Sequence, residues 1–196
     1  MFVVLEGGAG GGKTTQIDLL VKALSEMGCR VKRVSVLDDT EVGRQVRQIT
    51  KVVPHGKLGH RAEALLYLAA IGSAEDCLIS PALAEGFIVV GDRYISSTTA
   101  YQGYGGKLPL RWLKRIGILA VEGVLPNLTV YLDVPVEEGL ARRKDDPHFA
   151  QLPFRRRVRN GYLRMAKRDP NWLVVDATQS AEKVHEAILA AVVARL

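Results

Sequence analysis

The chain has 196 residues, 47% of them hydrophobic and 24% charged, which suits one globular domain of residues 1–196 and argues against disorder. Two cysteines are too few for a disulfide framework, the N-terminus lacks the basic segment of a signal peptide, and no apolar run reaches the roughly 18 residues of a membrane span, so we expect a cytoplasmic protein. The formal net charge of +6 indicates an anionic partner: a nucleic acid, a nucleotide or a membrane surface.

Strands and helices alternate along the predicted chain. Apolar runs predict strands at residues 2–6, 31–36, 87–92, 128–133 and 172–175. Helical spacing of apolar residues predicts helices at 13–27, 40–50, 61–84, 109–122 and 181–196, and two more from about 136 and about 154. Because such alternation builds βαβ units, we expect a three-layer α/β fold, a five-stranded parallel sheet with helices on both faces. Cys77 follows the pattern of the third helix and is expected in the core.

A glycine-rich segment from Gly7 to Thr14 follows the first strand and opens the first helix. It matches the pattern G-x-x-x-x-G-K-[ST], in which backbone N–H groups converge on a phosphate and the helix N-terminus faces the anion. Lys13 is expected to bind the β- and γ-phosphates of a nucleoside triphosphate, and Thr14 to ligate Mg²⁺. The expected phosphate-binding residues of this P-loop NTPase motif are Gly7, Gly8, Ala9, Gly10, Gly11, Gly12, Lys13, Thr14 and Thr15.

A second set of polar side chains, residues 92–103, follows the third predicted strand. Ligands of parallel sheets bind at the carboxyl ends of the strands, so this set should lie beside the glycine-rich loop. Asp92 is placed to hold Mg²⁺, directly or through water, and Arg93 to bind a second phosphate in a bidentate way. Tyr101 and Gln102 are suited to stack on a base and to hydrogen-bond with it.

With these two motifs the sequence resembles the thymidylate kinase family of nucleoside monophosphate kinases. The resemblance extends through almost the whole chain, and its most specific part is Ala100-Tyr-Gln-Gly103 after Asp92-Arg-Tyr94. Further matching stretches lie at 126–135, 139–143, 158–163 and 175–177. The resemblance implies transfer of the γ-phosphate of ATP to a pyrimidine deoxynucleoside monophosphate, usually dTMP. It also implies a homodimer formed across residues 61–83.

The resemblance also implies roles for individual residues. Lys13 and Thr14 would hold ATP and Mg²⁺, Arg93 would orient the acceptor phosphate, and Asp92 would belong to the metal and acceptor network. Arg142 and Arg143 would be the first residues of a lid at about 142–154 and would lie towards ATP. The acceptor pocket would be lined by Tyr67, which stacks on the base, and by Ser97, Tyr101 and Gln102. The catalytic residues would be Lys13, Asp92, Arg93, Arg142 and Arg143.

The sequence departs from the family pattern in four segments, most of which belong to the expected acceptor site. Ala9 replaces an acidic residue, Ser35-Val-Leu37 replaces an Arg-Glu-Pro sequence, and Ala70-Ile71 replaces an acidic or amide residue followed by an arginine that reads the base. The lid is short and lacks an Asp-Arg-x-Glu sequence. Three activities therefore remain open: a thymidylate kinase with a remodelled pocket, a kinase of another nucleotide or nucleoside, and an ATP-binding protein with little kinase activity.

The basic run Arg155-Arg156-Arg157 is compatible with a nucleic-acid patch, but helical spacing of Phe154, Val158 and Tyr162 favours an amphipathic helix with a solvated basic face. The segment lacks interleaved exposed aromatic residues on which bases could stack. The four histidines show no ligand spacing. We therefore expect a small nucleotide as partner, and neither a nucleic acid nor a membrane.

Overall fold

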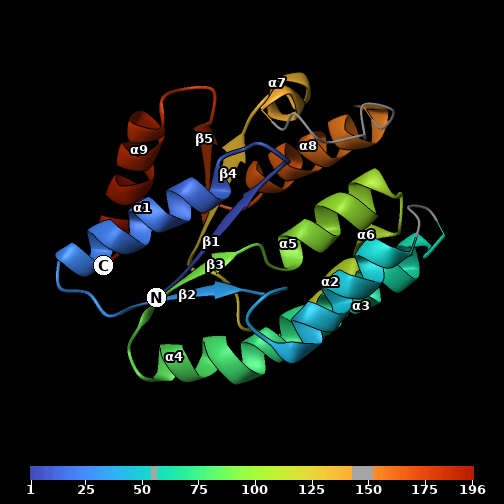
Figure 1. Cartoon of the computed structure of the whole chain (residues 1–196), viewed down its shortest axis with the longest axis horizontal. Helices are drawn as coiled ribbons and strands as arrows, with labels where there is room; N and C mark the ends of the chain where they lie inside the picture. The colour runs from blue at the N-terminus through green and yellow to red at the C-terminus, as the bar shows by residue number, and fades with distance from the viewer. Residues whose placement is uncertain (54–56, 143–151) are drawn as a thin grey trace.

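A parallel sheet of five strands forms the centre of the computed structural model, which describes residues 1–53, 57–142 and 152–196 (Figure 1). The strands are β1 (Phe2–Gly7), β2 (Val31–Ser35), β3 (Ile88–Asp92), β4 (Leu128–Asp133) and β5 (Trp172–Asp176). Every neighbouring pair is parallel, in the spatial order β2-β3-β1-β4-β5. The predicted sheet is therefore confirmed, and the segments after β1, β3 and β4 leave it at the same edge.

Helices cover both faces of the sheet, and alternate residues of β1 serve the two faces. Val3 and Leu5 pack with residues of α1 (Lys13–Glu26) and α9 (Ala181–Val193), whereas Phe2 and Val4 pack with residues of α3 (His60–Ala74) and α4 (Ser80–Ala84). In Figure 1, α1 and α9 lie on one side of the sheet and α2 to α6 on the other. The helices of the described residues are α1 (Lys13–Glu26), α2 (Glu41–Val52), α3 (His60–Ala74), α4 (Ser80–Ala84), α5 (Ile95–Thr98), α6 (Leu110–Ala120), α7 (Val136–Ala141), α8 (Leu152–Ala166) and α9 (Ala181–Val193), with π-helices η1 (Glu75–Ile79) and η2 (Thr99–Gly105).

The helix expected over residues 61–84 is divided by the π-helix η1. A π turn closes its hydrogen bonds over one residue more than an α turn, so it shifts the helical phase of the residues that follow. Cys77 lies inside this segment and is exposed. The prediction of a core cysteine is therefore wrong, because it assumed an uninterrupted α-helical phase.

Among residues 1–53, 57–142 and 152–196, no helix has both the length and the apolar character needed to cross a bilayer.

Candidate active site

The loop between β1 and α1 has the geometry of a phosphate cradle. Gly10 and Gly12 adopt left-handed φ angles of 70° and 79°, which L side chains rarely adopt. A Cβ on Gly10 would collide with the carbonyl oxygen of Gly139, so α7 fixes the loop from behind. A Cβ on Gly8 or Gly12 would meet no described atom within 4 Å. The loop therefore offers open space next to backbone that is held in place, as an anion site at a helix N-terminus requires.

Lys13 begins α1, and its side chain folds back over the mouth of the loop. Its Nζ donates to the carbonyl oxygens of Gly7 and Gly8, at 3.0 and 3.1 Å. Thr14 and Thr15 follow on the first turn, and both are exposed. The predicted amine and hydroxyl therefore lie at the open side of the cradle.

A buried carboxylate, Glu6, lies beneath the carboxyl end of β3. Its side chain accepts hydrogen bonds from the backbone N–H groups of Tyr94 and Ser97, both at 3.1 Å. It also accepts from the Ser97 hydroxyl at 2.6 Å and from the Tyr162 hydroxyl at 2.8 Å. Burial raises the pKa of Glu6 above its usual range, although Arg93 and these donors oppose the shift. Glu6 thus joins the sheet, α5 and α8 at one point.

Arg93 supplies the positive charge of the site, and its backbone is strained. Its φ is +67°, a left-handed value that costs a side-chain-bearing residue about 1 kcal/mol or more and that gathers at functional sites. Its guanidinium donates to the Ser97 Oγ at 3.0 Å and lies 5.3 Å from the centre of the Tyr101 ring. Burial acts to lower the pKa of Arg93, but the combined influence of Tyr101, Tyr162 and Glu6 raises it above its usual value. The guanidinium is therefore a permanently charged, pre-positioned phosphate ligand.

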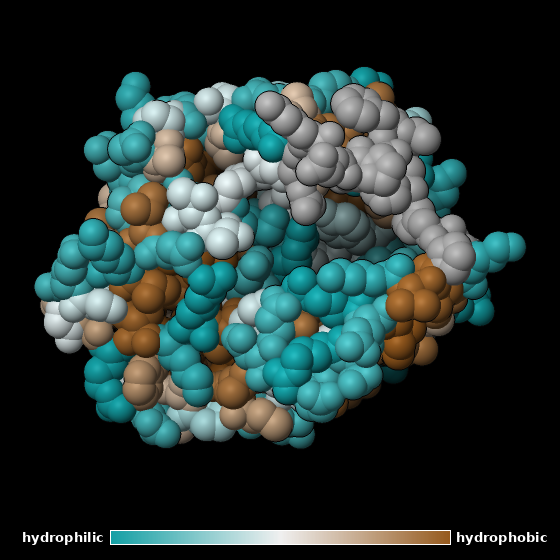
Figure 2. Space-filling view, viewed as in Figure 1, coloured by the Kyte–Doolittle hydropathy of each residue, from teal (hydrophilic) through white to brown (hydrophobic). Residues whose placement is uncertain are grey.

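All five residues expected to bind the acceptor line one cavity of about 590 Å³, which also contains Arg155. They are Tyr67, Arg93, Ser97, Tyr101 and Gln102. Figure 2 shows the surface hollowed above the hydrophilic ridge of α2. Leu37 and Ile71 line the same cavity, so two positions that depart from the family pattern form part of its wall.

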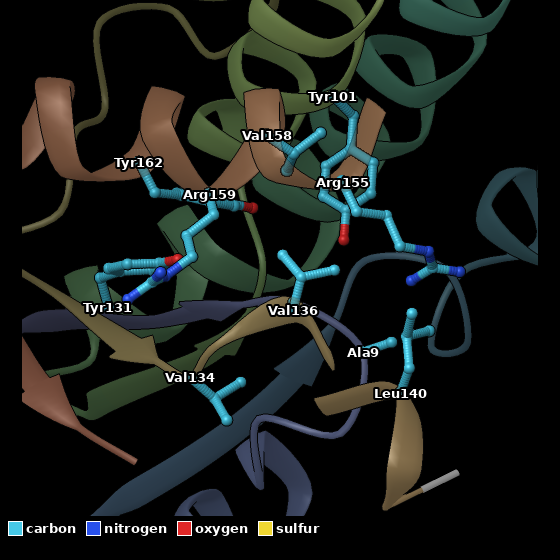
Figure 3. A pocket seen from close by; sticks show the side chains of 11 residues that line it. Ala9, Tyr101, Tyr131, Val134, Val136, Leu140, Arg155, Val158, Arg159 and Tyr162 are labelled. Carbon is cyan, nitrogen blue, oxygen red and sulfur yellow. The ribbon is translucent and has the colours of Figure 1, made fainter. Parts of the chain in front are cut away.

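A second hollow, of about 30 Å³, separates the glycine-rich loop from α8. Ala9 borders it from the loop, and Arg155, Arg159 and Tyr162 border it from α8 (Figure 3). Arg159 donates to both carboxylate oxygens of Asp133, at 2.7 and 2.8 Å. The basic face of α8 is therefore not merely solvated, as the sequence suggested, because part of it faces the loop.

Arg142 lies at the end of α7, next to the glycine-rich loop. It donates to the carbonyl oxygens of Gly10 at 3.3 Å and Ala177 at 2.9 Å, and it pairs with Glu138 at 2.7 Å. These contacts tie the loop to the turn between β5 and α9. Arg143 and most of the expected lid at 142–154 lie outside the described residues.

The two predicted magnesium ligands lie at adjacent strands of the sheet: Asp92 is the last residue of β3, and Thr14 lies on the first turn of α1, after β1. The Asp92 Oδ1 is buried without a hydrogen-bond partner among the described residues, and the Thr14 hydroxyl is exposed. The described residues contain no cluster of three or more His, Cys, Asp or Glu side chains that could hold a metal. This donor set fits Mg²⁺, which takes one or two protein ligands and completes its shell with water and phosphate oxygens.

The sequence patterns do not identify Glu6 or Tyr162 as site residues. The available signal for Glu6 is a carboxylate at the end of an otherwise apolar strand, because burial of a charge is costly unless it is hydrogen-bonded. Tyr162 lies on the predicted inner face of its helix, but only the tertiary structure brings its hydroxyl to Glu6. The two residues are 156 positions apart in the sequence.

Comparison with known proteins places this site in a described family. A family model called thymidylate kinase matches residues 5–188. A thymidylate kinase of Pelotomaculum thermopropionicum is 41% identical over 197 residues, covering 97% of this chain and 91% of that protein. One of Trichlorobacter lovleyi is 37% identical over 208 residues, covering 100% and 98%. One of Thermomicrobium roseum is 41% identical over 198 residues, covering 97% and 93%.

Proposed function

The chain belongs to the thymidylate kinase family, and we propose that it transfers the γ-phosphate of ATP to dTMP seated in the cavity of about 590 Å³. It is a nucleoside monophosphate kinase and an ATP-dependent phosphotransferase. One observation carries the placement of the acceptor: the five residues expected to bind it, which include the half-buried cation Arg93, line a single cavity. The match over residues 5–188 supports the proposal that residues 1–196 are one kinase domain.

Arg93 binds the phosphate of dTMP in this proposal. The neighbouring Tyr101, Tyr162 and Glu6 favour its charged form, and the Ser97 hydroxyl links it to the Glu6 carboxylate. These two hydrogen bonds set the orientation of the guanidinium before the acceptor binds, so the side chain needs little reorganisation on binding. The attacking phosphate oxygen is thereby held at the edge of the sheet where the glycine-rich loop begins.

The thymine base occupies the other end of the cavity. Tyr67 supplies a ring for stacking, and Leu37 and Ile71 supply an apolar wall that suits the 5-methyl group. Gln102 is 4% exposed, its Nε2 donates to Glu63 at 3.3 Å, and its Oε1 is buried without a partner among the described residues. An unpaired buried acceptor is costly, and the N3–H of thymine would satisfy it.

The donor nucleotide is placed by the glycine-rich loop. Lys13 exchanges its contacts with the Gly7 and Gly8 carbonyls for the β- and γ-phosphates, and the N-terminus of α1 faces the same anion. Arg142, which is fixed to Gly10 and Ala177, is placed beside the adenine. Phosphoryl transfer of this kind depends on alignment and charge neutralisation rather than on covalent chemistry by the protein.

Mg²⁺ would be held by the Thr14 hydroxyl and by the Asp92 carboxylate, directly or through water. The ion supplies neutralisation of phosphate charge. The unpartnered Asp92 Oδ1 supports this assignment, because a bound ion or its water shell would satisfy it.

An acceptor panel tests the proposed function. ADP release with ATP and Mg²⁺ is measured against dTMP, dUMP, the other nucleoside monophosphates and thymidine, with Lys13→Ala as the blank. We expect dTMP to give the fastest turnover. Turnover with another acceptor alone would contradict the proposal and would assign the apolar wall of Leu37 and Ile71 to a different substrate.

A homodimer across α3 is also proposed. Leu65 of α3 is 53% exposed, and Leu119 of α6, which packs against α3, is 75% exposed. Sedimentation of the wild type and of Leu65→Glu tests this interface, and a monomer for both would contradict it. The nucleotide substrates and the two free cysteines support a cytoplasmic location.

A further inference from the structure

Two hollows of the structure share a boundary made by Tyr101 and Arg155. Among the described residues, these two line both the small hollow at the glycine-rich loop and the large acceptor cavity. Figure 3 shows the Arg155 side chain extending over the end of the small hollow at which Ala9 and Leu140 lie. Arg155 therefore lies between the proposed places of the donor and the acceptor.

A phosphoryl group that moves between the two nucleotides must cross this boundary. Negative charge on its oxygens must be neutralised there, and in P-loop enzymes an arginine often performs this task. Residues 7–12 contain only glycines and Ala9, so the loop contributes its cation through Lys13 alone. Ala9 has a single methyl group at the boundary and leaves room for a long side chain from α8.

The two arginines that follow Arg155 directly on α8 lie elsewhere. Arg156 pairs with Glu137 on the outer side of the helix, at 2.5 Å, and its side chain is 62% exposed. Arg157 donates to the carbonyl oxygen of Gly105 at 2.9 Å. Neither residue lines one of the two hollows. Arg159 lines only the small hollow, where it pairs with Asp133, so Arg155 is the arginine of α8 that borders both hollows.

We propose that Arg155 is a catalytic residue whose guanidinium contacts the phosphoryl group during its transfer. The inference rests on the proposed function and deepens it. In the reaction, the bond between the γ-phosphorus and the β–γ bridging oxygen breaks, and ADP leaves with the electron pair. A new bond joins the γ-phosphorus to a phosphate oxygen of dTMP, which gives dTDP. Arg155 neutralises the charge on the transferred group and takes part in no proton transfer.

Kinetics of Arg155→Ala, Arg155→Lys and the matched control Arg156→Ala test the proposal. Arg155→Ala is expected to lower kcat about 10³-fold and to change the KM values for ATP and dTMP less than about threefold, because the contact forms in the transition state. Arg155→Lys keeps the charge but loses the planar fork, so its kcat should fall between those of wild type and Arg155→Ala. Arg156→Ala should match the wild type. Added guanidinium ion should restore part of the turnover of Arg155→Ala and none of that of Lys13→Ala.

Several results would overturn the inference. If kcat of Arg155→Ala stays within about threefold of wild type, or if only a KM changes, Arg155 does not act on the transferred group. If Arg155→Ala unfolds, Arg155→Lys and Arg155→Gln decide the matter, and equal kcat values for these two would count against a charge contact. A wild type that releases no ADP with dTMP overturns the proposed function and the inference together. An active wild type with an unaffected Arg155→Ala overturns the inference alone.

Discussion

Replacement of Arg93 by Met is expected to leave the Glu6 carboxylate buried without the guanidinium that faces it. The Ser97 hydroxyl joins the two groups through contacts of 3.0 and 2.6 Å, so a nitrogen of Arg93 lies within about 5.6 Å of a Glu6 oxygen. Two unit charges at that distance interact with about 3 kcal/mol at an effective dielectric constant of about 20. Arg93→Met should therefore lower the free energy of unfolding by about 3 kcal/mol where Glu6 is ionised.

A double-mutant cycle separates this charge effect from lost packing. Glu6→Gln combined with Arg93→Met removes both charges and should recover most of the loss, because removal of a buried pair costs far less than removal of one member. Urea unfolding at a fixed pH gives the four free energies. If Arg93→Met lost as much stability in the presence of Glu6→Gln as it does alone, the reasoning would be refuted.

The same variant should have a characteristic pH dependence. Burial already raises the pKa of Glu6 in the folded protein, and loss of Arg93 should raise it further. A carboxyl whose folded pKa exceeds its unfolded value contributes stability that is present below the unfolded pKa and is lost as the pH rises through the folded pKa. The deficit of Arg93→Met should therefore grow with pH, and a deficit that is constant from about pH 5 to about pH 9 would contradict this.

Three further substitutions probe the two nucleotide sites. Lys13→Ala should abolish dTDP formation because the amine is the loop's side-chain cation, and retained turnover would remove Lys13 from the mechanism. Tyr67→Ala should raise the KM for dTMP about 5- to 150-fold, since stacking on a base contributes about 1–3 kcal/mol; an unchanged KM would place the base elsewhere. Arg142→Ala should raise the KM for ATP and leave that for dTMP unchanged, because its contacts fix the loop of Gly10; equal effects on both would contradict its assignment to the donor.

The sequence was sufficient to predict the sheet and the meeting of the site residues at one edge of it, because local patterns determine both. Apolar runs of about four to six residues specify buried parallel strands, and the topology of such strands brings their carboxyl ends to one edge. Tyr67 and Arg93 accordingly reach one cavity from different elements. The match to the thymidylate kinase family confirms the family prediction and the predicted kinase activity.

The remaining features depend on contacts that no local pattern encodes. The Glu6–Tyr162 hydrogen bond joins distant parts of the chain, and its presence follows from the way α8 packs on the sheet. The π-helix changes the phase of a helix whose apolar spacing looks regular, which is why Cys77 faces outward. Arg155 has the same residue type as its two neighbours in the basic run, so its place between the two hollows is evident only in three dimensions.

Transfer of a radioactive label from the γ-phosphate of ATP in the presence of dTMP is the decisive experiment on the proposed reaction. We expect the label in dTDP, at a rate that Arg93→Ala lowers mainly through the KM for dTMP while ATP binding is retained. Label found only in inorganic phosphate, or in no product despite measurable ATP binding, would contradict the claim that the cavity around Arg93 presents dTMP to the donor.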